Sequence, residues 1–375
     1  MEFRDLKKQY KKLKKEIDSG IREVIESSSF ILGEQVSILE KRLAEYVGRK
    51  HCITCASGTD ALQLSLMAWG IGLGDAVFTS DFTYFASAGT TSILGGTPVF
   101  VDIDIKTFNM DPISLEEQIL RVLKEGKLTP KAVIPVDLFG QPADYDKIVP
   151  IAEKYGLKVL EDAAQGFGGR IRDKKACSFG NLSITSFFPA KPLGCYGDGG
   201  AIFTDEDEMD TRLRSLRVHG RSPIDKYDNR EVGLNSRLDT IQAAILLPTL
   251  NAFIEYELDA VNLVADWYNK RLIGKVVTPC IAEGFFSSWA QYSILLENDV
   301  SRDNIKNKLK QKDIPSMIYY PRGLHQQEVY RCMNLNDDMY ANTVNVTRRV
   351  LSLPIHPYME EYEVNTICEV ILGQI

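Results

Sequence analysis

Residues 131–165, KAVIPVDLFGQPADYDKIVPIAEKYGLKVLEDAAQ, decide the fold class of this 375-residue chain. The apolar run at 131–139 predicts a strand, the amphipathic stretch 145–156 predicts a helix, and the apolar run at 157–164 predicts a second strand. Two strands joined by one helix form a βαβ unit, in which the strands run parallel. Near-continuous apolar strands are expected when helices cover both faces of the sheet.

The same alternation extends toward the N-terminus. Further strands are expected at 51–56, 75–80 and 97–103, and helices at 4–26, 35–47 (ended by Gly48), 57–71, 84–94 and 114–125. The pattern predicts an α/β fold with a mostly parallel central sheet flanked by helices. Beyond residue 245 it loosens into long helices and a few strands. We therefore expect a large domain at 1–245 and a smaller C-terminal α+β domain at 246–375, on which the N-terminal helix can pack.

Composition excludes several classes of protein. The 44 Lys and Arg residues against 51 Asp and Glu give a net charge of −7 without a basic stripe, which argues against nucleic acid as a partner. No apolar run reaches the roughly 18 residues of a membrane span, and the charged start MEFRDLKKQYKKLKKE lacks a signal-peptide core. Seven scattered cysteines predict a reduced, cytoplasmic protein. Cys52 and Cys55 form a CxxC without a second pair, so no metal site is expected.

Ligands of open α/β sheets bind beyond the carboxyl ends of the strands, so the residues there carry most information. The stretch 56–60, ASGTD, joins a strand to a helix. Gly58 and Thr59 would let backbone N–H groups approach a phosphate at the helix N-terminus. Thr59 and Asp60 could equally be ordinary helix caps, and both readings stay open. The spacing is not that of a P-loop.

A second stretch, LEDAAQ at 160–165, places Asp162 and Gln165 after a buried strand. One reading is a capped strand end. The other is a carboxylate aimed at a protonated heterocycle nitrogen, with Gln165 reaching an adjacent oxygen. A buried carboxylate needs a partner to stay ionised, and a pyridinium ring would supply one.

The third stretch, TSFFPAKPLGCYGDGG at 185–200, holds Lys191 among aromatic residues, prolines and glycines. A desolvated lysine has a lowered pKa and becomes a nucleophile toward carbonyl carbons. The alternative is a surface loop whose lysine points to water. Ser186 lies five residues upstream of Lys191. A phosphate site, a carboxylate and a reactive amine together are what pyridoxal 5'-phosphate requires, and their order is similar to that in fold-type-I enzymes of this cofactor.

Longer motifs make the resemblance specific. SGTDAL, FTYFASA, PVDLFGQPAD, LEDAAQGFG, TSFFPAK, GDGGAIFT, RVHG, NSRLDTIQAAIL and LSLPIHP follow one another over most of the chain. In this it resembles the DegT/DnrJ group of sugar-nucleotide aminotransferases, and SFFPAKPLGCYGDGGAIFT is most similar to the WbpE/WlbC branch. Members of that branch aminate UDP-2-acetamido-2-deoxy-3-oxo-D-glucuronate with L-glutamate, releasing 2-oxoglutarate. Their products feed surface polysaccharides such as the O-antigen of lipopolysaccharide.

The resemblance implies roles for single residues. Lys191 matches the catalytic lysine that holds the cofactor and moves the proton. Asp162 matches the partner of the ring nitrogen, and Gln165 the contact to the phenolic oxygen. The full set of implied cofactor contacts is Gly58, Thr59, Tyr84, Asp162, Gln165, Ser186, Lys191 and, from a neighbouring subunit, Asn235. Tyr84 would stack on the ring, although a core aromatic is its plain alternative.

Substrate contacts are implied at Arg237, Tyr319 and His325. Asn235 and Arg237, in LNSRLD, resemble residues that reach the neighbouring subunit's site, which implies a homodimer with shared sites. A guanidinium at Arg237 would suit an acidic group of the nucleotide-sugar substrate. In YYPRGLHQ at 319–326, Gly323 replaces the usual second proline, which leaves the loop shape open.

Five further residues are weighed as contacts to a nucleotide. His219, Arg217 and Arg221 could contact a nucleotide diphosphate, whereas Arg212 and Arg214 fit a solvated helix face better.

Other functions stay open on sequence alone. An aminotransferase of this family could act on another 3-keto or 4-keto sugar carried by UDP or dTDP. A non-catalytic regulator could keep the cofactor fold, and an interaction protein could lack the cofactor altogether. The lysine at 191, where related dehydratases have histidine, favours transamination. The sugar, its nucleotide carrier and any assembly beyond a dimer are not determined by these motifs.

Overall fold

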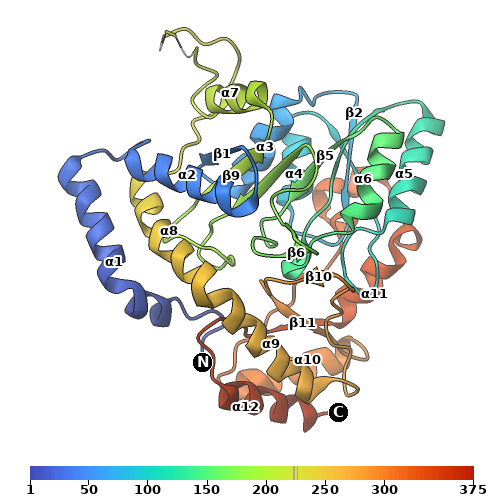
Figure 1. Ribbon diagram of the computed structural model, residues 1–375. Helices are drawn as coiled ribbons and strands as arrows, with labels where there is room; N and C mark the ends of the chain where they lie inside the picture. The colour runs from blue at the N-terminus through green and yellow to red at the C-terminus, as the bar shows by residue number, and fades with distance from the viewer. Residues whose placement is uncertain (223, 226) are drawn as a thin grey trace.

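The computed structural model describes residues 1–222, 224–225 and 227–375. Within them, the central sheet has the strand order β1-β9-β8-β5-β4-β2-β3, and all neighbours except those of β9 run parallel (Figure 1). This confirms the predicted α/β fold with a mostly parallel sheet. Its strands are β1 (His51–Cys55), β2 (Asp75–Ser80), β3 (Thr97–Val101), β4 (Thr129–Ile134), β5 (Lys158–Asp162), β8 (Leu182–Ser186) and β9 (Gly200–Thr204).

The reversed strand β9 departs from the predicted βαβ repetition. A parallel neighbour needs a long crossover, usually a helix, whereas an antiparallel one needs only a turn. β8 and β9 are joined by the loop 187–199, which carries Lys191 and contains no helix. The predicted strand at 131–139 also ends early, at Ile134, because Pro135 has no N–H for the sheet. A 3₁₀ turn at Leu138–Gly140 follows it.

Helices cover both faces of the sheet, as predicted. Successive residues of a strand face opposite sides. Thus Val159 packs with α5 and α6, and Leu160 packs with α3. The helices of this part are α1 (Leu6–Ser27), α2 (Glu34–Val47), α3 (Gly58–Ala68), α4 (Ala86–Ile93), α5 (Pro112–Glu125), α6 (Tyr145–Lys154), α7 (Asp207–Leu216) and α8 (Thr240–Ala252). Gly48 ends α2 with φ +82°, as its position predicts.

The CxxC of β1 is divided by the same alternation. Cys52 packs among residues of α2 and α8, whereas Cys55 packs among residues of α3 on the other face. The two thiols therefore face opposite sides of the sheet. Both are buried, and burial raises the pKa of each.

A second hydrophobic core lies in the C-terminal part. It is formed by α9 (Leu258–Leu272), α10 (Asp299–Gln311), α12 (Glu361–Leu372) and the pair of strands β11 (Tyr292–Leu295) and β12 (Val350–Leu353). A π-helical turn at Phe253–Glu257 joins α8 to α9 without a break, and Leu258 packs against both cores. Residue 245 lies inside α8, whose buried face belongs to the first core. We therefore propose that the domains divide near residue 258.

The remaining elements are short. They are β6 (Arg170–Ile171), β7 (Lys174–Lys175), β10 (Phe285–Phe286), the 3₁₀ turns Leu324–Gln326, Glu328–Met333 and Asp337–Tyr340, and α11 (Ala341–Arg349). The segment 324–340 packs back on the large domain, since Leu324 and Tyr330 share a cluster with Phe100 of β3.

The N-terminal helix α1 packs along α8. Leu13 and Ile17 of α1 share a cluster with Ile245 and Ala252 of α8. At its start, Lys8 donates to the Tyr358 carbonyl (3.2 Å), so the helix also contacts the C-terminal part. Figure 1 shows both chain termini at that end of the molecule.

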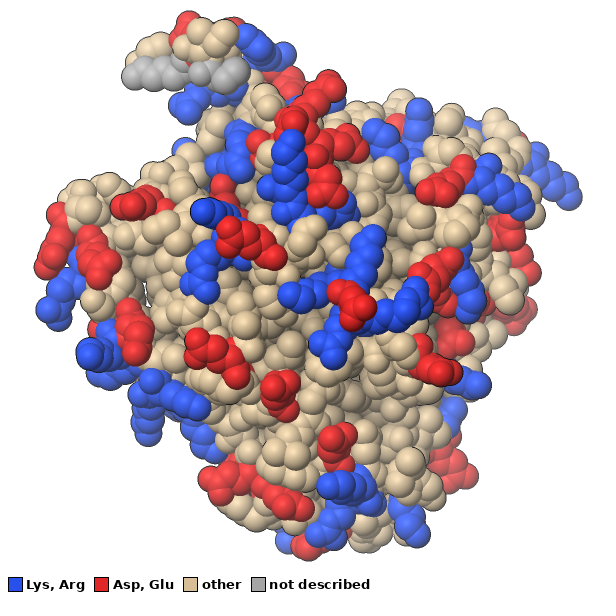
Figure 2. All heavy atoms as spheres, in the orientation of Figure 1, with Lys and Arg blue, Asp and Glu red and all other residues tan. Residues whose placement is uncertain are grey.

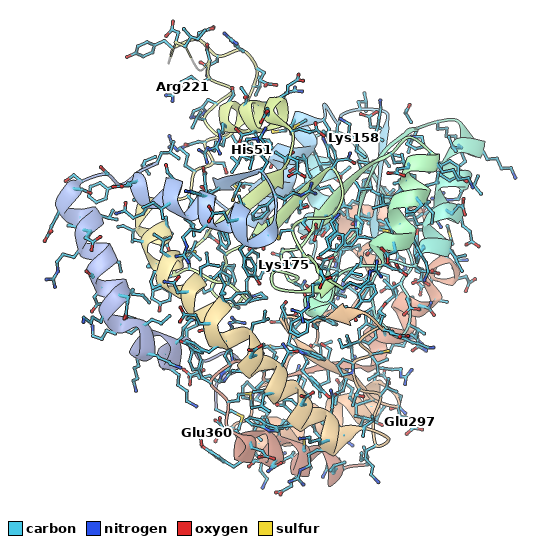
Figure 3. The ribbon with its side chains drawn as sticks, viewed as in Figure 1. His51, Lys158, Lys175, Arg221, Glu297 and Glu360 are labelled. Carbon is cyan, nitrogen blue, oxygen red and sulfur yellow. The ribbon has the colours of Figure 1, made fainter. Side chains whose placement is uncertain are left out.

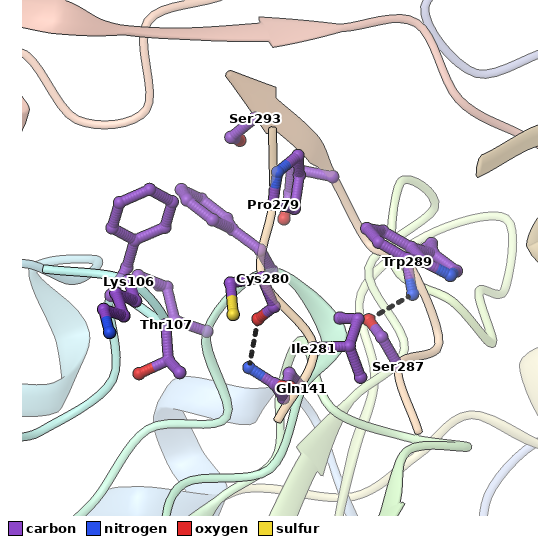
Figure 4. A pocket seen from close by; sticks show the side chains of 13 residues that line it. Lys106, Thr107, Gln141, Pro279, Cys280, Ile281, Ser287, Trp289 and Ser293 are labelled. Atoms are coloured by element: carbon purple, nitrogen blue, oxygen red, sulfur yellow. Dashed lines mark hydrogen bonds between the residues drawn. The ribbon is translucent and has the colours of Figure 1, made fainter. Parts of the chain in front are cut away.

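The two parts also meet at a small hollow of about 20 Å³, room for roughly one water molecule (Figure 4). Its lining residues lie within 106–141 of the large part and within 279–293 of the C-terminal part. Across it, Gln141 donates through Nε2 to the Cys280 carbonyl (3.3 Å). This contact ties the 3₁₀ turn after β4 to the C-terminal part.

The surface bears charges of both signs. On the face shown in Figure 2, Lys and Arg side chains are interspersed with Asp and Glu side chains. No helix in the described ranges combines the length and apolarity needed to cross a bilayer.

One buried ion cluster joins α2, β1 and α7. Glu40 is 8% exposed and accepts from Thr54 N–H (2.9 Å), Arg214 (2.8 Å) and Arg217 (2.7 Å). Burial alone would raise the pKa of Glu40, but Arg217 and Arg214 outweigh it and the pKa lies below its usual value. The carboxylate therefore stays ionised and holds the three elements together.

We predict that Glu40→Ala lowers the free energy of unfolding by about 3–5 kcal/mol, because it leaves the buried guanidinium of Arg217 without a carboxylate partner. Glu45→Ala, on the same helix, removes an exposed carboxylate 3.9 Å from Lys41 and should cost less than about 0.5 kcal/mol. Urea denaturation of the two variants measures the difference. Equal losses would contradict the role of the Glu40 cluster.

Candidate active site

One cavity of about 740 Å³ lies at the carboxyl ends of the parallel strands. Its walls come from residues that follow β1, β2, β4, β5 and β8, and from the segment 318–327 of the C-terminal part. The structure brings eight of the sequence-predicted residues to this cavity: Gly58, Thr59, Tyr84, Asp162, Gln165, Ser186, Lys191 and Tyr319. The position agrees with the general rule for ligand sites in α/β sheets.

The start of α3 forms one end of the cavity. Ser57 caps the helix by accepting from the Asp60 N–H (3.0 Å), and Ser236 donates to the Asp60 carboxylate (2.6 Å). The helix cap is therefore Ser57, and the predicted caps Thr59 and Asp60 lie inside the first helical turn instead. The N–H groups of the first helical turn have no partner within a helix, so Gly58 and Thr59 are placed to bind an anion as well.

Gly58 allows α3 to approach β8 closely. A Cβ atom added to Gly58 would lie 2.7 Å from Cβ of Ser186. Any larger residue would push Ser186 away from the helix N-terminus. The Ser186 hydroxyl and the first N–H groups of α3 therefore lie within one small region.

Asp162 is the last residue of β5, and only 4% of its surface is exposed. Its Oδ2 accepts from the Ser87 hydroxyl (2.8 Å) and its Oδ1 from the Ala164 N–H (3.2 Å). Burial raises the pKa of Asp162, while these bonds and the charge of Lys191 act in the opposite direction. A cationic ring nitrogen would stabilise the ionised form further.

Lys191 is half-buried in the loop between β8 and β9. Backbone bonds from Lys191 N–H to the Phe188 carbonyl and from Cys195 N–H to the Phe187 carbonyl (both 2.8 Å) fix the turn around it. Burial lowers the pKa of the Lys191 amine, and the charge of Asp162 partly opposes this. The lowered pKa increases the neutral, nucleophilic fraction of the amine.

Gln165 is held in one orientation. Its Oε1 accepts from the Phe139 N–H (3.1 Å), and its Nε2 donates to the Tyr320 hydroxyl (3.2 Å). Tyr84 also faces the cavity and is 58% exposed, so the alternative that it is a core aromatic residue is wrong. A ring with one accessible face is available for stacking on a planar ligand.

Sequence reasoning missed three residues around the site. Ser87 hydrogen-bonds Asp162 from α4, and a lone serine in FTYFASA gives little signal of that. Tyr320 contacts Gln165, but the motif YYPRGLHQ does not indicate which of its two tyrosines faces the site. Arg4 donates to the carbonyl of Pro192, next to Lys191 (2.8 Å), from 188 residues away. A charged N-terminus gives no sequence signal for such a contact.

His325 is placed differently from the expectation. Its side chain is 1% exposed and does not line the cavity. Nδ1 contacts Asp81 (2.6 Å), Nε2 contacts Asp337 (3.0 Å), and the ring stacks on Tyr340. With both ring nitrogens taken by carboxylates, we infer that His325 holds the loop 319–327 in place instead of touching substrate.

Gly323 keeps the loop shape that a proline would allow. Its φ of −68° lies within the range of proline. A Cβ at this position would clash with Asp81 Oδ2 and lie 2.8 Å from His325 Nδ1. Glycine therefore lets the Asp81–His325 pair pack directly against the loop.

The remaining predicted residues lie outside this cavity. Arg237 lines a separate open hollow with His219 and Arg221, and Asn235 is exposed nearby in sequence. Figure 3 shows Arg221 beyond α7, at the end of the molecule opposite the C-terminal helices. Arg237 and Asn235 therefore do not line the cavity of their own chain.

The predicted contact of Arg217 with a nucleotide diphosphate is wrong, because its guanidinium is buried against Glu40 and the Thr54 carbonyl. Arg212 pairs with Glu231, as expected for a surface helix. Arg214 departs from that reading, since it reaches buried Glu40 as well as Asp210.

A reactive amine, a buried carboxylate and a helix N-terminus around one cavity define a pyridoxal-phosphate-dependent enzyme of fold-type I. The profile of the DegT/DnrJ/EryC1/StrS aminotransferase family matches residues 11–372. The chain belongs to this family and is a pyridoxal-phosphate-dependent aminotransferase.

Individual relatives match over almost their whole length. The chain is 45% identical to a UDP-2-acetamido-2-deoxy-3-oxo-D-glucuronate aminotransferase of Pseudomonas aeruginosa, covering 98% of each protein. It is 40% identical to a protein of Geobacillus stearothermophilus named as a pleiotropic regulatory protein, covering 97% of this chain and 96% of that one. A crystal structure of a DegT/DnrJ/EryC1/StrS aminotransferase from Brucella abortus superposes with a TM-score of 0.96 at 45% identity, covering 100% of this chain and 99% of the other.

The residues present fit the cofactor. Gly58, Thr59 and Ser186 offer hydrogen-bond donors for its phosphate, and Asp162 offers a carboxylate for its ring nitrogen. Lys191 offers the amine for its aldehyde carbon. All five line the same cavity, as binding of one molecule requires.

We predict that Gly58→Ala weakens cofactor binding by roughly 5- to 150-fold, because about 1–3 kcal/mol of overpacking displaces Ser186 from the helix start. Gly72→Ala is the matched control, since the nearest atom to its added Cβ is 3.9 Å away. Equilibrium dialysis of the cofactor against both variants measures the effect. Equal dissociation constants for the two variants would show that the approach of α3 to Ser186 is unimportant.

A second prediction concerns the pH at which Lys191 reacts. Only the neutral amine is acylated, so in the cofactor-free protein Lys191 should label with a midpoint below the ordinary lysine pKa of 10.5. Asp162→Asn should move the midpoint lower still, because the carboxylate favours the ammonium form. Lys147 is the internal comparison, since hydrogen bonding to Asp144 raises its pKa. Competitive labelling read by peptide mass spectrometry tests this, and a midpoint for Lys191 at or above that of Lys147 would refute it.

Proposed function

We propose that this aminotransferase moves the amino group of L-glutamate to UDP-2-acetamido-2-deoxy-3-oxo-D-glucuronate, giving the 3-amino sugar and 2-oxoglutarate. The convergence of Lys191 and Asp162 on one cavity with the start of α3 carries the amino-transfer part of this proposal. The named activity of the Pseudomonas aeruginosa relative, 45% identical over 98% of both chains, supports the sugar.

The side chains divide the work. When bound, the cofactor supplies an aldehyde carbon that accepts the amino group and a ring that takes up electrons from the carbon losing its proton. Lys191 would remove the α-proton of glutamate and later deliver a proton to the sugar carbon. Asp162 would keep the ring nitrogen of the bound cofactor protonated. Glutamate's product leaves before the sugar enters, which is ping-pong kinetics.

We further propose that the active unit is a homodimer. Arg237 and Asn235 lie outside their own chain's cavity, and Arg237 lines an open surface hollow. These positions support the reading that they complete the site of a second copy. The guanidinium of Arg237 would then meet an acidic group of the substrate there.

Subunit complementation tests the shared site. Lys191→Ala and Arg237→Ala should each be nearly inactive alone. After mixing under conditions that exchange subunits, half of the dimers carry both variants, and one of their two sites is intact. Activity should return to about a quarter of the wild-type value. No recovery, despite exchange shown by native mass spectrometry, would contradict a shared site.

A substrate panel tests the sugar. With glutamate as donor, mass spectrometry should show amination of the 3-oxo-glucuronate and little of dTDP-4-keto sugars. Amination of a 4-keto sugar alone would refute the proposed substrate. A wild-type protein that binds the cofactor but aminates nothing would favour a regulator, as the name of the Geobacillus relative suggests for that protein.

We place the reaction in the cytoplasm, where its product would supply surface polysaccharide such as O-antigen. The seven cysteines support a reducing compartment, because all of them are unpaired.

A further inference from the structure

Arg322 is a cation in the active-site wall that the reaction outlined above does not use. It lines the same cavity as Lys191 and Asp162, and its side chain is exposed. Throughout the ranges that the structure describes, its guanidinium has no ion pair or hydrogen bond. The other cationic residue that lines the cavity is Lys191, and its amine is the group that would bind the cofactor.

Hydrogen bonds hold the residues on both sides of Arg322. Before it, the Tyr320 hydroxyl accepts from Gln165 (3.2 Å). After it, Leu324 N–H donates to the Asp81 carbonyl and His325 N–H to the Asp81 carboxylate (both 2.8 Å). The guanidinium thus extends from a turn that is held in place, and its N–H groups can donate hydrogen bonds to a ligand. Because the residues around it are held, binding a ligand has to order only the Arg322 side chain.

The reaction explains why an unpaired guanidinium would be useful at this place. In ping-pong kinetics the donor and the keto-sugar occupy the same cavity in turn. Under the proposed function both carry a carboxylate besides the reacting carbon: the side-chain carboxylate of glutamate and the C6 carboxylate of the sugar. A guanidinium fork matches a carboxylate in two parallel hydrogen bonds.

We propose that Arg322 binds a substrate carboxylate and so selects acidic substrates over neutral ones of the same shape. This inference rests on the proposed function, which supplies both the keto-sugar and glutamate as substrates. Arg322 is then the chain's own specificity residue, in addition to Arg237 from the second copy.

The experiment compares substrate pairs that differ only in that carboxylate. One pair is UDP-2-acetamido-2-deoxy-3-oxo-D-glucuronate and its C6-hydroxymethyl counterpart. The other is L-glutamate and L-glutamine, followed in single turnovers by the spectral change of the cofactor. In Arg322→Gln, kcat/KM for the acidic member of a pair should fall about 10- to 150-fold, as expected for one lost charged hydrogen-bonding contact, while the neutral member changes less than about twofold. Arg322→Lys should restore part of the loss, since it keeps the charge without the fork.

Arg331→Gln is the matched control, because Arg331 lies nearby in sequence and pairs on the surface with Glu328 (2.6 Å). It should leave all four substrates unchanged. A selective loss in either pair supports the proposal and identifies which carboxylate Arg322 binds. Equal losses on acidic and neutral members, as expected if Arg322 holds the nucleotide diphosphate, would overturn it, and so would no loss. If the wild-type protein aminates neither 3-keto sugar, the proposed substrate fails, and the glutamate pair alone decides the role of Arg322.

Discussion

The site depends on keeping one amine and one carboxylate poorly solvated within the same cavity. Burial pushes the pKa of Lys191 down and that of Asp162 up, so both groups are biased toward their neutral forms. Their mutual attraction works against this bias. Pyridoxal phosphate would resolve the conflict, because its aldehyde would bond to the amine and its ring nitrogen would pair with the carboxylate. The protein is in this sense organised for a ligand that completes it.

The fold supplies this pair through two strand ends. Asp162 ends β5 and Ser186 ends the parallel neighbour β8, so both arrive at the same edge of the sheet. The chain then turns back through the Lys191 loop into β9 without a crossover helix. In a βαβ unit, a helix on one face of the sheet would join the two strands. Here a loop joins them, and it places Lys191 over the strand ends.

Much of this was predictable from sequence because it is local. The apolar runs, the helix periodicities and Gly48 predicted most elements to within a few residues. The three stretches holding Gly58, Asp162 and Lys191 predicted one cavity. Contacts between distant segments were not predictable, because their pairing is set by tertiary packing. Arg4 beside Pro192, Arg217 against Glu40 and His325 between two carboxylates all have ordinary sequence surroundings, and motif likeness alone suggested a substrate role for His325.

We propose that Lys191 holds the cofactor and releases it to the amino donor. Borohydride reduction of the holoprotein, followed by peptide mapping, tests this directly. We expect a cofactor-derived mass on the peptide containing Lys191, and its disappearance when L-glutamate is added before reduction. A label on another lysine, or a label on Lys191 that glutamate does not remove, would contradict it.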